Sequence, residues 1–494
     1  MQRMIEAQQR QIEIQKNEIG TLRRILTEKR KSSLPAAAIA NAAPHPSEPA
    51  AADPLETLQM REEALAQQMR EEKRSATTVS LSGGKPAMAS PDGRFSAAVS
   101  VLGQYDTAYY MQKAVALRLA SAEGRDLSSG SNFRRMQLGL GGKLAGDWSY
   151  FFNYDFGGTA SEGVGRIQSA YIEYDGLAPF LFRIGAYAPA SGLEAGTSAA
   201  NLMFLERNSP SNIALNMAGG DGRDGIGITY AGSRIFATVN YTADHIQDTG
   251  VFDEQQALVG RLSGVVYPCE DSVAVLSSDG SYIFKVADAA PGANASASFS
   301  LGDMPELTVD NSGAKLITTG PMNARDVWQW GLESGVRWRS LYAQGGYFRF
   351  GMDLRNGGGS DGFGGWYAQA AWTITGEPRT YSPVSGAFVN PAPRQPFSPA
   401  MGGWGAWEIV GRYSEMDLND KNGTAGSTPS AAAVLGGEQR IGTAGLNWYP
   451  VTTLRFEFQY QHVIIDRLGA FSASGYSQLG QRFDSLALRS QIAF

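Results

Sequence analysis

The chain of 494 residues lacks the residues on which several protein classes depend. Its one cysteine, Cys269, allows neither an intrachain disulfide nor a cysteine metal cluster. Its three histidines, His45, His245 and His462, lie far apart in the sequence. A formal net charge of -6 and a pI near 5.4 argue against a nucleic-acid partner.

Long hydrophobic runs are also missing, since no stretch approaches the roughly 18 apolar residues that a membrane helix needs. A transmembrane strand, however, needs only about 9–11 residues, of which half are apolar. Because apolar and polar residues alternate in such a strand, its average hydropathy stays low. The mean hydropathy of -0.23 is therefore compatible with a membrane location. The 59 glycines and the 10% of aromatic residues suit tight strands, long loops and aromatic girdles.

What is present is alternation, most clearly at the end of the chain. Successive side chains of a strand face opposite sides. From 485 to 494, one parity is mainly apolar and the other mainly polar. The apolar set is Leu486, Leu488, Ile492 and Phe494, and the polar set is Ser485, Arg489 and Gln491.

The same alternation recurs through residues 94–494, for example over 95–104, 135–140, 148–156, 180–184, 329–339, 407–414 and 454–461. Short turns, as at 145–147 and 231–233, alternate with long loops, as at 188–223 and 419–437. This arrangement is typical of outer-membrane barrels. We therefore predict an all-β fold, a transmembrane antiparallel β-barrel of about 16 strands with lipid outside and water inside.

Two further zones precede the barrel. In residues 1–31, Ile5, Ile12, Ile19 and Leu26 recur every seven residues, which predicts an α-helical coiled coil or, as the alternative, a single solvated amphipathic helix. Residues 32–93 are rich in Ala and Pro and predict a linker, with a possible short helix over 55–73. No hydrophobic signal region follows Met1, so we expect that an export signal was removed or lies upstream.

In the predicted strands, charged residues occupy the alternate positions whose side chains are inferred to face the lumen. A lipid-facing Arg or Lys near the midplane costs about 2–4 kcal/mol, so lumen placement is favoured. Guanidinium groups along an aqueous path attract anions. The alternative is a mixed-charge lumen that stays wet without selecting any ion. The candidate pore-lining arginines are Arg135, Arg183, Arg337, Arg349, Arg412 and Arg455.

The loop over 188–223 contains an apolar run that cannot easily sit in water alone. It could fold into the barrel and present Glu206 and Arg207 at a constriction. The alternative is an exterior loop packed against a neighbouring subunit. The chain shows no convincing catalytic, metal or cofactor site: Gly139–Lys143 loosely matches a phosphate loop, but Leu144 stands where Ser or Thr is needed.

Most of 94–494 resembles the phosphate-selective porin O and P family. The resemblance is clearest at 133–148, 170–174, 204–207 and 402–414, with the turn at 375–379 followed by 386–388. It implies a sixteen-stranded trimeric porin with its third loop folded inward, an arginine-lined path for anions, and a terminal Phe494 that signals barrel assembly. Lysine, abundant in the family's phosphate specialists, is sparse: Lys113, Lys143, Lys285, Lys315 and Lys421 are the whole set in this region.

These observations favour a passive porin in a Gram-negative outer membrane, with outer-membrane lipid, copies of itself in a homotrimer, and small anionic or hydrophilic solutes as partners. The N-terminal segment would then lie in the periplasm. A second hypothesis is an envelope tether, in which residues 1–90 grip a periplasmic partner such as the cell wall. Neither hypothesis involves nucleic acid, a cofactor or catalysis.

Overall fold

The computed structural model describes residues 60–67, 76–112, 126–158, 165–246, 253–290, 295–310, 314–422, 428–468 and 480–494. The chain divides into two units, Met1–Lys73 and Arg74–Phe494. In the first unit, residues 60–67 are helical. The predicted coiled coil over residues 1–31 lies outside the described residues. Within the described ranges, no helix is both long enough and apolar enough to cross a membrane.

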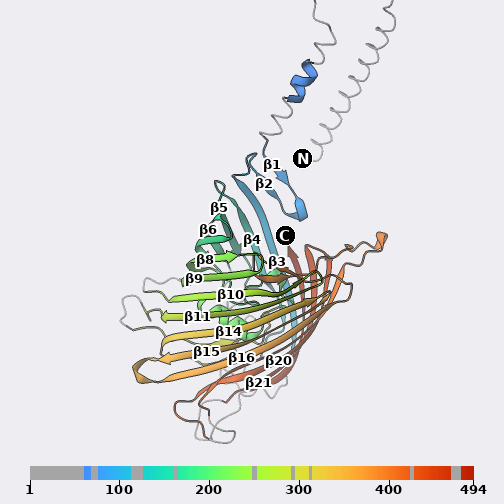
Figure 1. The fold of residues 1–494 in the computed structure, drawn as a ribbon. Helices are drawn as coiled ribbons and strands as arrows, with labels where there is room; N and C mark the ends of the chain where they lie inside the picture. The colour runs from blue at the N-terminus through green and yellow to red at the C-terminus, as the bar shows by residue number, and fades with distance from the viewer. Residues whose placement is uncertain are drawn as a thin grey trace, which may run out of the picture. The chain divides into compact units, whose positions relative to one another are not determined.

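Sixteen strands of the second unit close into an antiparallel barrel, as the alternation predicts (Figure 1). Barrel strands adjacent in the chain pair with each other, and β22 pairs with β3 to complete the ring. A hairpin of β1 (Thr78–Ser80) and β2 (Ala87–Ala89) adds to the start of β3. The barrel strands are β3 (Ser96–Met111), β4 (Gly130–Lys143), β5 (Trp148–Asp155), β6 (Arg166–Leu177), β7 (Phe180–Tyr187), β8 (Arg223–Ala231), β9 (Ile235–His245), β10 (Gln256–Cys269), β11 (Ser272–Lys285), β14 (Ala324–Trp338), β15 (Leu341–Leu354), β16 (Ser360–Thr373), β19 (Ala406–Asp420), β20 (Val434–Val451), β21 (Leu454–Asp466) and β22 (Arg482–Ala493).

The two faces of the barrel wall carry opposite kinds of side chain. Large apolar residues point outward and stay exposed, as Phe458 (45%) and Leu488 (54%) do. Polar and charged residues on the other parity point inward and are buried, among them Asp106, Glu408 and Arg489. An apolar exterior around a polar interior is the pattern of a barrel surrounded by lipid.

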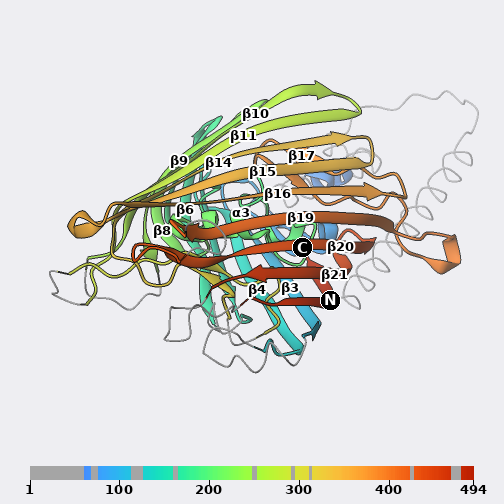
Figure 2. The ribbon, with the colours of Figure 1, turned by 90° about the horizontal axis from the view of Figure 1, so that it is seen from below.

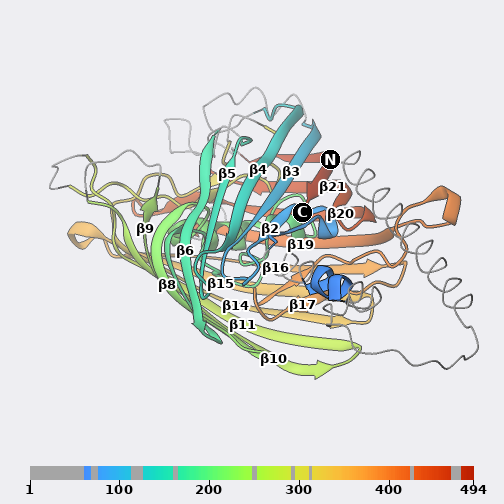
Figure 3. The same cartoon turned by 90° about the horizontal axis from the view of Figure 1, so that it is seen from above.

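The two ends of the barrel differ in their connections. At one end, here called the short-turn end, strands are joined by turns such as 178–179, 270–271 and 339–340. The hairpin of β1 and β2 lies at this end, because β2 pairs with the start of β3 (Figure 3). The opposite end carries most of the long connections and is here called the long-loop end. One long connection, residues 374–405 between β16 and β19, departs from this rule because it belongs to the short-turn end.

Three long connections fold into the barrel. Residues 188–222 carry helix α3 (Ser209–Ala218), which contacts the inward faces of β11, β15, β16 and β19 and is seen within the ring of strands in Figure 2. Residues 286–323 carry β12 (Gly302–Asp303) and β13 (Ile317–Thr318), and residues 374–405 carry β17 (Thr380–Ser382) and β18 (Ala387–Val389). The loop that the sequence predicts to fold inward therefore does so, together with two other segments.

These inward segments give the barrel an apolar core of its own. Leu205 and Ile213 of the first segment cluster with Phe348, Phe350 and Met352 of β15, which are all 0% exposed. The sequence-based placement of Arg349 in the lumen is therefore wrong. Because its apolar neighbours turn inward, Arg349 faces outward, opposite Trp330 of β14.

Candidate permeation pathway

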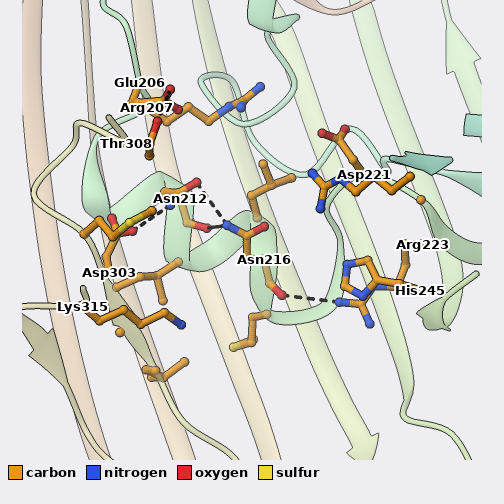
Figure 4. A pocket seen from close by; sticks show the side chains of 18 of the residues that line it. Glu206, Arg207, Asn212, Asn216, Asp221, Arg223, His245, Asp303, Thr308 and Lys315 are labelled. Carbon is orange, nitrogen blue, oxygen red and sulfur yellow. Dashed lines mark hydrogen bonds between the residues drawn. The ribbon is translucent and has the colours of Figure 1, made fainter. Parts of the chain in front are cut away.

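A cavity of about 740 Å³ lies at the long-loop end, between α3, the inward residues 299–308 and the ends of β6, β8 and β9 (Figure 4). Titratable side chains from six different segments converge on it. The basic residues are Arg134, Arg135, Arg166, Arg207, Arg223, His245 and Lys315, and the acidic residues are Glu206, Asp221, Asp244, Asp303 and Glu306.

Glu206 is the centre of a buried charge cluster at this cavity. It accepts Nε of Arg134 at 2.7 Å and Nη2 of Arg489 at 3.2 Å, and Nη2 of Arg135 lies 3.7 Å away. Arg489 also pairs with Asp106. Burial by itself would raise the pKa of Glu206, but the attraction of the three guanidinium groups outweighs it and holds this pKa well below its ordinary value. Among the described residues, the cluster thus joins Arg134, Arg135 and Arg489 to the carboxylates of Glu206 and Asp106.

A β-bulge brings two consecutive arginines into that cluster. The pairing of β3 with β4 shifts register between Gln104 and Tyr105, so that Gln104 lies opposite Arg135 and Tyr105 opposite Phe133. Arg134 is the extra residue, and it reaches the inside together with Arg135. Strict alternation assigns Arg134 to the outward face, which is why the sequence did not reveal it.

Two of the cavity's cations have no carboxylate partner within the part of the chain that the structure describes. Arg207 donates to the carbonyl oxygens of Thr197 (2.6 Å) and Glu194 (3.4 Å). Lys315 is exposed to the cavity. By contrast, Nη1 of Arg223 lies 3.4 Å from the carboxylate of Asp244. Arg207 and Lys315 thus present positive charge to the cavity without neutralisation by direct pairing.

Two predicted pore arginines, Arg412 and Arg455, act together with Arg489 as anchors for the inward loop. Arg412 donates to the carbonyl of Glu206 (2.9 Å), and Arg455 to those of Leu202 (2.5 Å) and Met203 (3.1 Å). Arg489 donates to the carbonyl of Leu205 (2.5 Å). All three side chains are at most 2% exposed. The anchors hold residues 202–206 against the wall of β19, β21 and β22, because buried backbone carbonyls require hydrogen-bond donors.

The beginning of the same loop is held by carboxylates. Glu333 of β14 accepts the backbone N–H groups of Leu193 (2.5 Å) and Glu194 (3.2 Å) and the hydroxyl of Tyr367 (2.6 Å). The Glu194 side chain accepts from Gln344 (3.2 Å) and Gln369 (2.9 Å). The loop is therefore attached to the wall at both its start and its centre.

Residues 374–405 enter the barrel from the short-turn end and contact the side of the inward loop that faces that end. Arg379 forms a salt bridge with Glu408 (2.6 Å) and donates to the carbonyl of Asn201 (3.1 Å). Asn390 donates to the carbonyl of Ala200 (2.7 Å). Two connections from opposite ends of the barrel thus meet in its interior and narrow it.

The remaining predicted residues lie away from the cavity. Arg183 of β7 faces inward and pairs with Glu173 of β6 at 2.6 Å. Arg337 lies near the short-turn end, where Nη1 donates to the carbonyl of Glu270 at 3.4 Å. The structure brings Arg135, Glu206, Arg207 and Arg412 together around the loop, places Arg455 beneath it, and separates Arg183 and Arg337 from this group.

A closed barrel with an apolar exterior, a polar interior and inward-folded loops defines a porin-type channel of the outer membrane. The family of phosphate-selective porins O and P matches residues 116–472. Because this match covers well over half of the chain, the protein belongs to that family and is an outer-membrane porin.

Individual relatives are distant. Porin O of Pseudomonas aeruginosa is 25% identical over 358 residues, which cover 68% of this chain and 77% of that protein. An uncharacterized protein of Caulobacter vibrioides is 25% identical over 361 residues, covering 70% of this chain and 65% of its own. Among solved structures, the outer membrane channel DcaP of Acinetobacter baumannii is 12% identical with a TM-score of 0.46, covering 81% of this chain and 97% of its own. The anion-selective porin from Comamonas acidovorans is 13% identical with a TM-score of 0.43, covering 81% of this chain and 100% of its own.

Proposed function

We propose that this porin admits small hydrophilic solutes by passive diffusion and favours anions, with phosphate or similar anions as its substrates. The observation that carries the proposal is the unneutralised positive charge at the cavity. Arg207 and Lys315 line this cavity and have no carboxylate partner among the described residues. The family and the printed name of its phosphate-selective members support the same substrate class.

Fixed charges in a narrow aqueous path select ions because surrounding protein and lipid screen them less than bulk water does. The acidic net charge of -6 belongs to the whole chain. The charge that a solute meets is the local one, and at this cavity it includes Arg207 and Lys315, which have no carboxylate partner among the described residues.

Reversal potentials across a planar bilayer with a KCl gradient test the proposal. We expect chloride to permeate in preference to potassium, and added phosphate to reduce the chloride current by competing for the same cations. Cation preference in the unmodified protein would contradict the anion bias and leave a general porin.

We further propose a homotrimer whose short-turn end faces the periplasm, as short turns do in outer-membrane barrels. The domains would then be a coiled coil over 1–31, a linker over 32–93 and the barrel over 94–494, the first two in the periplasm. The hairpin of β1 and β2 supports this orientation because it joins β3 at the short-turn end.

The heptad pattern of residues 1–31 supports a second role as an envelope tether. Removing residues 1–73, which leaves the hairpin and barrel intact, would then weaken attachment of the envelope while conductance stays unchanged. Unchanged attachment together with altered conductance would contradict the tether.

A further inference from the structure

The wall of β5, β6 and β7 is the part of the barrel interior that the inward segments leave most open. Along most of these three strands, the inward-facing side chains are half-buried. On β16, β19, β21 and β22, by contrast, almost all inward positions are buried, because α3 and the anchored loop cover them. Side chains on β5–β7 are therefore more accessible from the barrel interior than those on β16, β19, β21 and β22.

Three aromatic side chains form a row on this open wall. Phe151 of β5, Tyr171 of β6 and Tyr187 of β7 follow one another with ring centroids 5.8 and 6.0 Å apart. All three rings face the inside of the barrel, where Phe151 and Tyr171 are half-buried and Tyr187 is buried. Phe151 stands between Ser149 and Asn153, so the sequence itself shows an aromatic residue where alternation favours a polar one.

Arg183 lies over this row. Its Cζ atom is 4.2 Å from the ring centroid of Tyr171 and 5.1 Å from that of Tyr187. Nε and Nη2 donate to Glu173, and Nη1 donates to no residue that the structure describes. The side chain is 30% exposed, so one edge of the guanidinium remains free to receive an anion from the lumen.

The ring of Phe151 packs against two glycines of β4, Gly139 and Gly141. A Cβ atom at Gly141 would lie 2.7 Å from Cδ2 of Phe151, and one at Gly139 would lie 3.2 Å from its Cζ. The absence of side chains lets the ring lie directly over β4. The ring is thereby fixed in place, yet it stays half-buried and in contact with the lumen.

From this arrangement we propose that Phe151, Tyr171, Tyr187 and Arg183, here called the aromatic strip, bind carboxylates that carry a flat aromatic ring. The free edge of Arg183 receives the carboxylate, and the ring of the solute packs against Tyr171 and Phe151. The inference rests on the proposed anion-favouring porin and names a second class of substrate for it.

Benzoate and cyclohexanecarboxylate test the strip, since both carry one negative charge and a six-membered ring but only benzoate is flat and aromatic. We expect benzoate to inhibit chloride current through the purified protein at concentrations roughly three- to tenfold lower than cyclohexanecarboxylate. Phe151→Leu and Tyr171→Leu should each bring the two inhibitory concentrations together. Phe152→Leu, which changes the neighbouring outward-facing ring, should leave their ratio unaltered.

Equal inhibition by the two carboxylates in the unmodified protein would overturn the inference, and so would a benzoate preference that persists in both inward-facing variants. The KCl reversal potential, measured in the same membranes, separates the two proposals. Equal inhibition by the two carboxylates, together with chloride preference, contradicts only the proposed role of the aromatic strip. If the unmodified protein shows no chloride preference, the proposed anion bias itself is contradicted.

Discussion

Arg489 and Asp106 lie directly opposite each other across the seam where the last strand of the barrel meets the first. Nε and Nη2 of Arg489 each lie 2.6 Å from one oxygen of the Asp106 carboxylate. Neither side chain is more than 1% exposed. The same guanidinium also holds the carbonyl of Leu205 and the carboxylate of Glu206, so a single residue joins barrel closure to loop position.

We expect Arg489→Met to destabilise the barrel by about 3–5 kcal/mol, because it leaves Asp106 buried without its partner. Urea unfolding in detergent micelles measures the loss. Arg339→Met is the matched control: Arg339 is 69% exposed in a turn and lies 3.7 Å from Asp271, a contact expected to contribute less than about 1 kcal/mol. Similar losses in both variants would argue against a special role for the seam.

The sequence predicted the barrel well because a strand has a side-chain period of two, and that period is visible wherever one face meets lipid. It placed Arg135, Arg412 and Arg455 on the correct face for this reason. It could not show whether an inward arginine meets water or a loop carbonyl. That outcome depends on contacts such as Arg489 with Leu205, 284 residues apart in the chain.

For two arginines, alternation along the strand predicts the wrong face of the barrel wall, and each exception has a physical cause. Arg134 enters the lumen through a bulge, which adds one residue and breaks the parity. Arg349 faces outward because Phe348 and Phe350 are drawn to an interior apolar core that only the folded segments create. The inward fold of residues 374–405 left no periodic signal, since its support comes from single contacts such as Arg379 with Glu408.

Arg207 and Lys315 are expected to determine ion selectivity. Arg207→Ala and Lys315→Ala each remove a cation that faces the cavity, and we expect each to shift the KCl reversal potential toward potassium, with the double variant shifting it further. The matched control is Lys421→Ala, which removes a cation paired with Asp361 away from the cavity. If that variant shifts the potential as much as the cavity variants do, the assignment fails.

Arg349→Ala should leave ion selectivity unchanged, although alternation along the sequence assigns Arg349 to the lumen. The side chain faces outward beside Trp330 and so cannot meet a permeating ion. The KCl reversal potential of this variant, compared with that of Arg207→Ala, checks the placement. A shift of equal size in the two variants would contradict the outward position.

Arg455 is expected to act on the loop and not on the ion. Arg455→Lys keeps the charge, but a single ammonium cannot reproduce the planar fork that reaches Leu202, Met203 and Glu457 together. We expect noisier single-channel currents from the loosened loop with little change in reversal potential. Quiet currents combined with altered selectivity would instead show that Arg455 contacts the solute.

Asp303 gives the channel an expected dependence on pH. It lies in the inward segment, lines the cavity and accepts from Asn212 at 2.8 Å. Burial, followed by the nearby charge of Glu306, raises the pKa of Asp303 from 3.8 to about 7, against the effect of its hydrogen bonds. The carboxyl is therefore neutral in slightly acidic solution and becomes charged as the pH rises through neutrality.

Two consequences follow from this titration. Between pH 3.8 and about 7 the unfolded chain has released the proton that the folded protein still binds, so the contribution of Asp303 to stability falls as the pH rises through that window. Above about pH 7, the ionised Asp303 adds a negative charge to the cavity.

We expect chloride preference to decline between about pH 6 and 8, and Asp303→Asn to remove most of that decline. Asp221→Asn, which removes another carboxylate of the same cavity, should preserve the step. A step that survives in Asp303→Asn would assign the pH dependence to a different group.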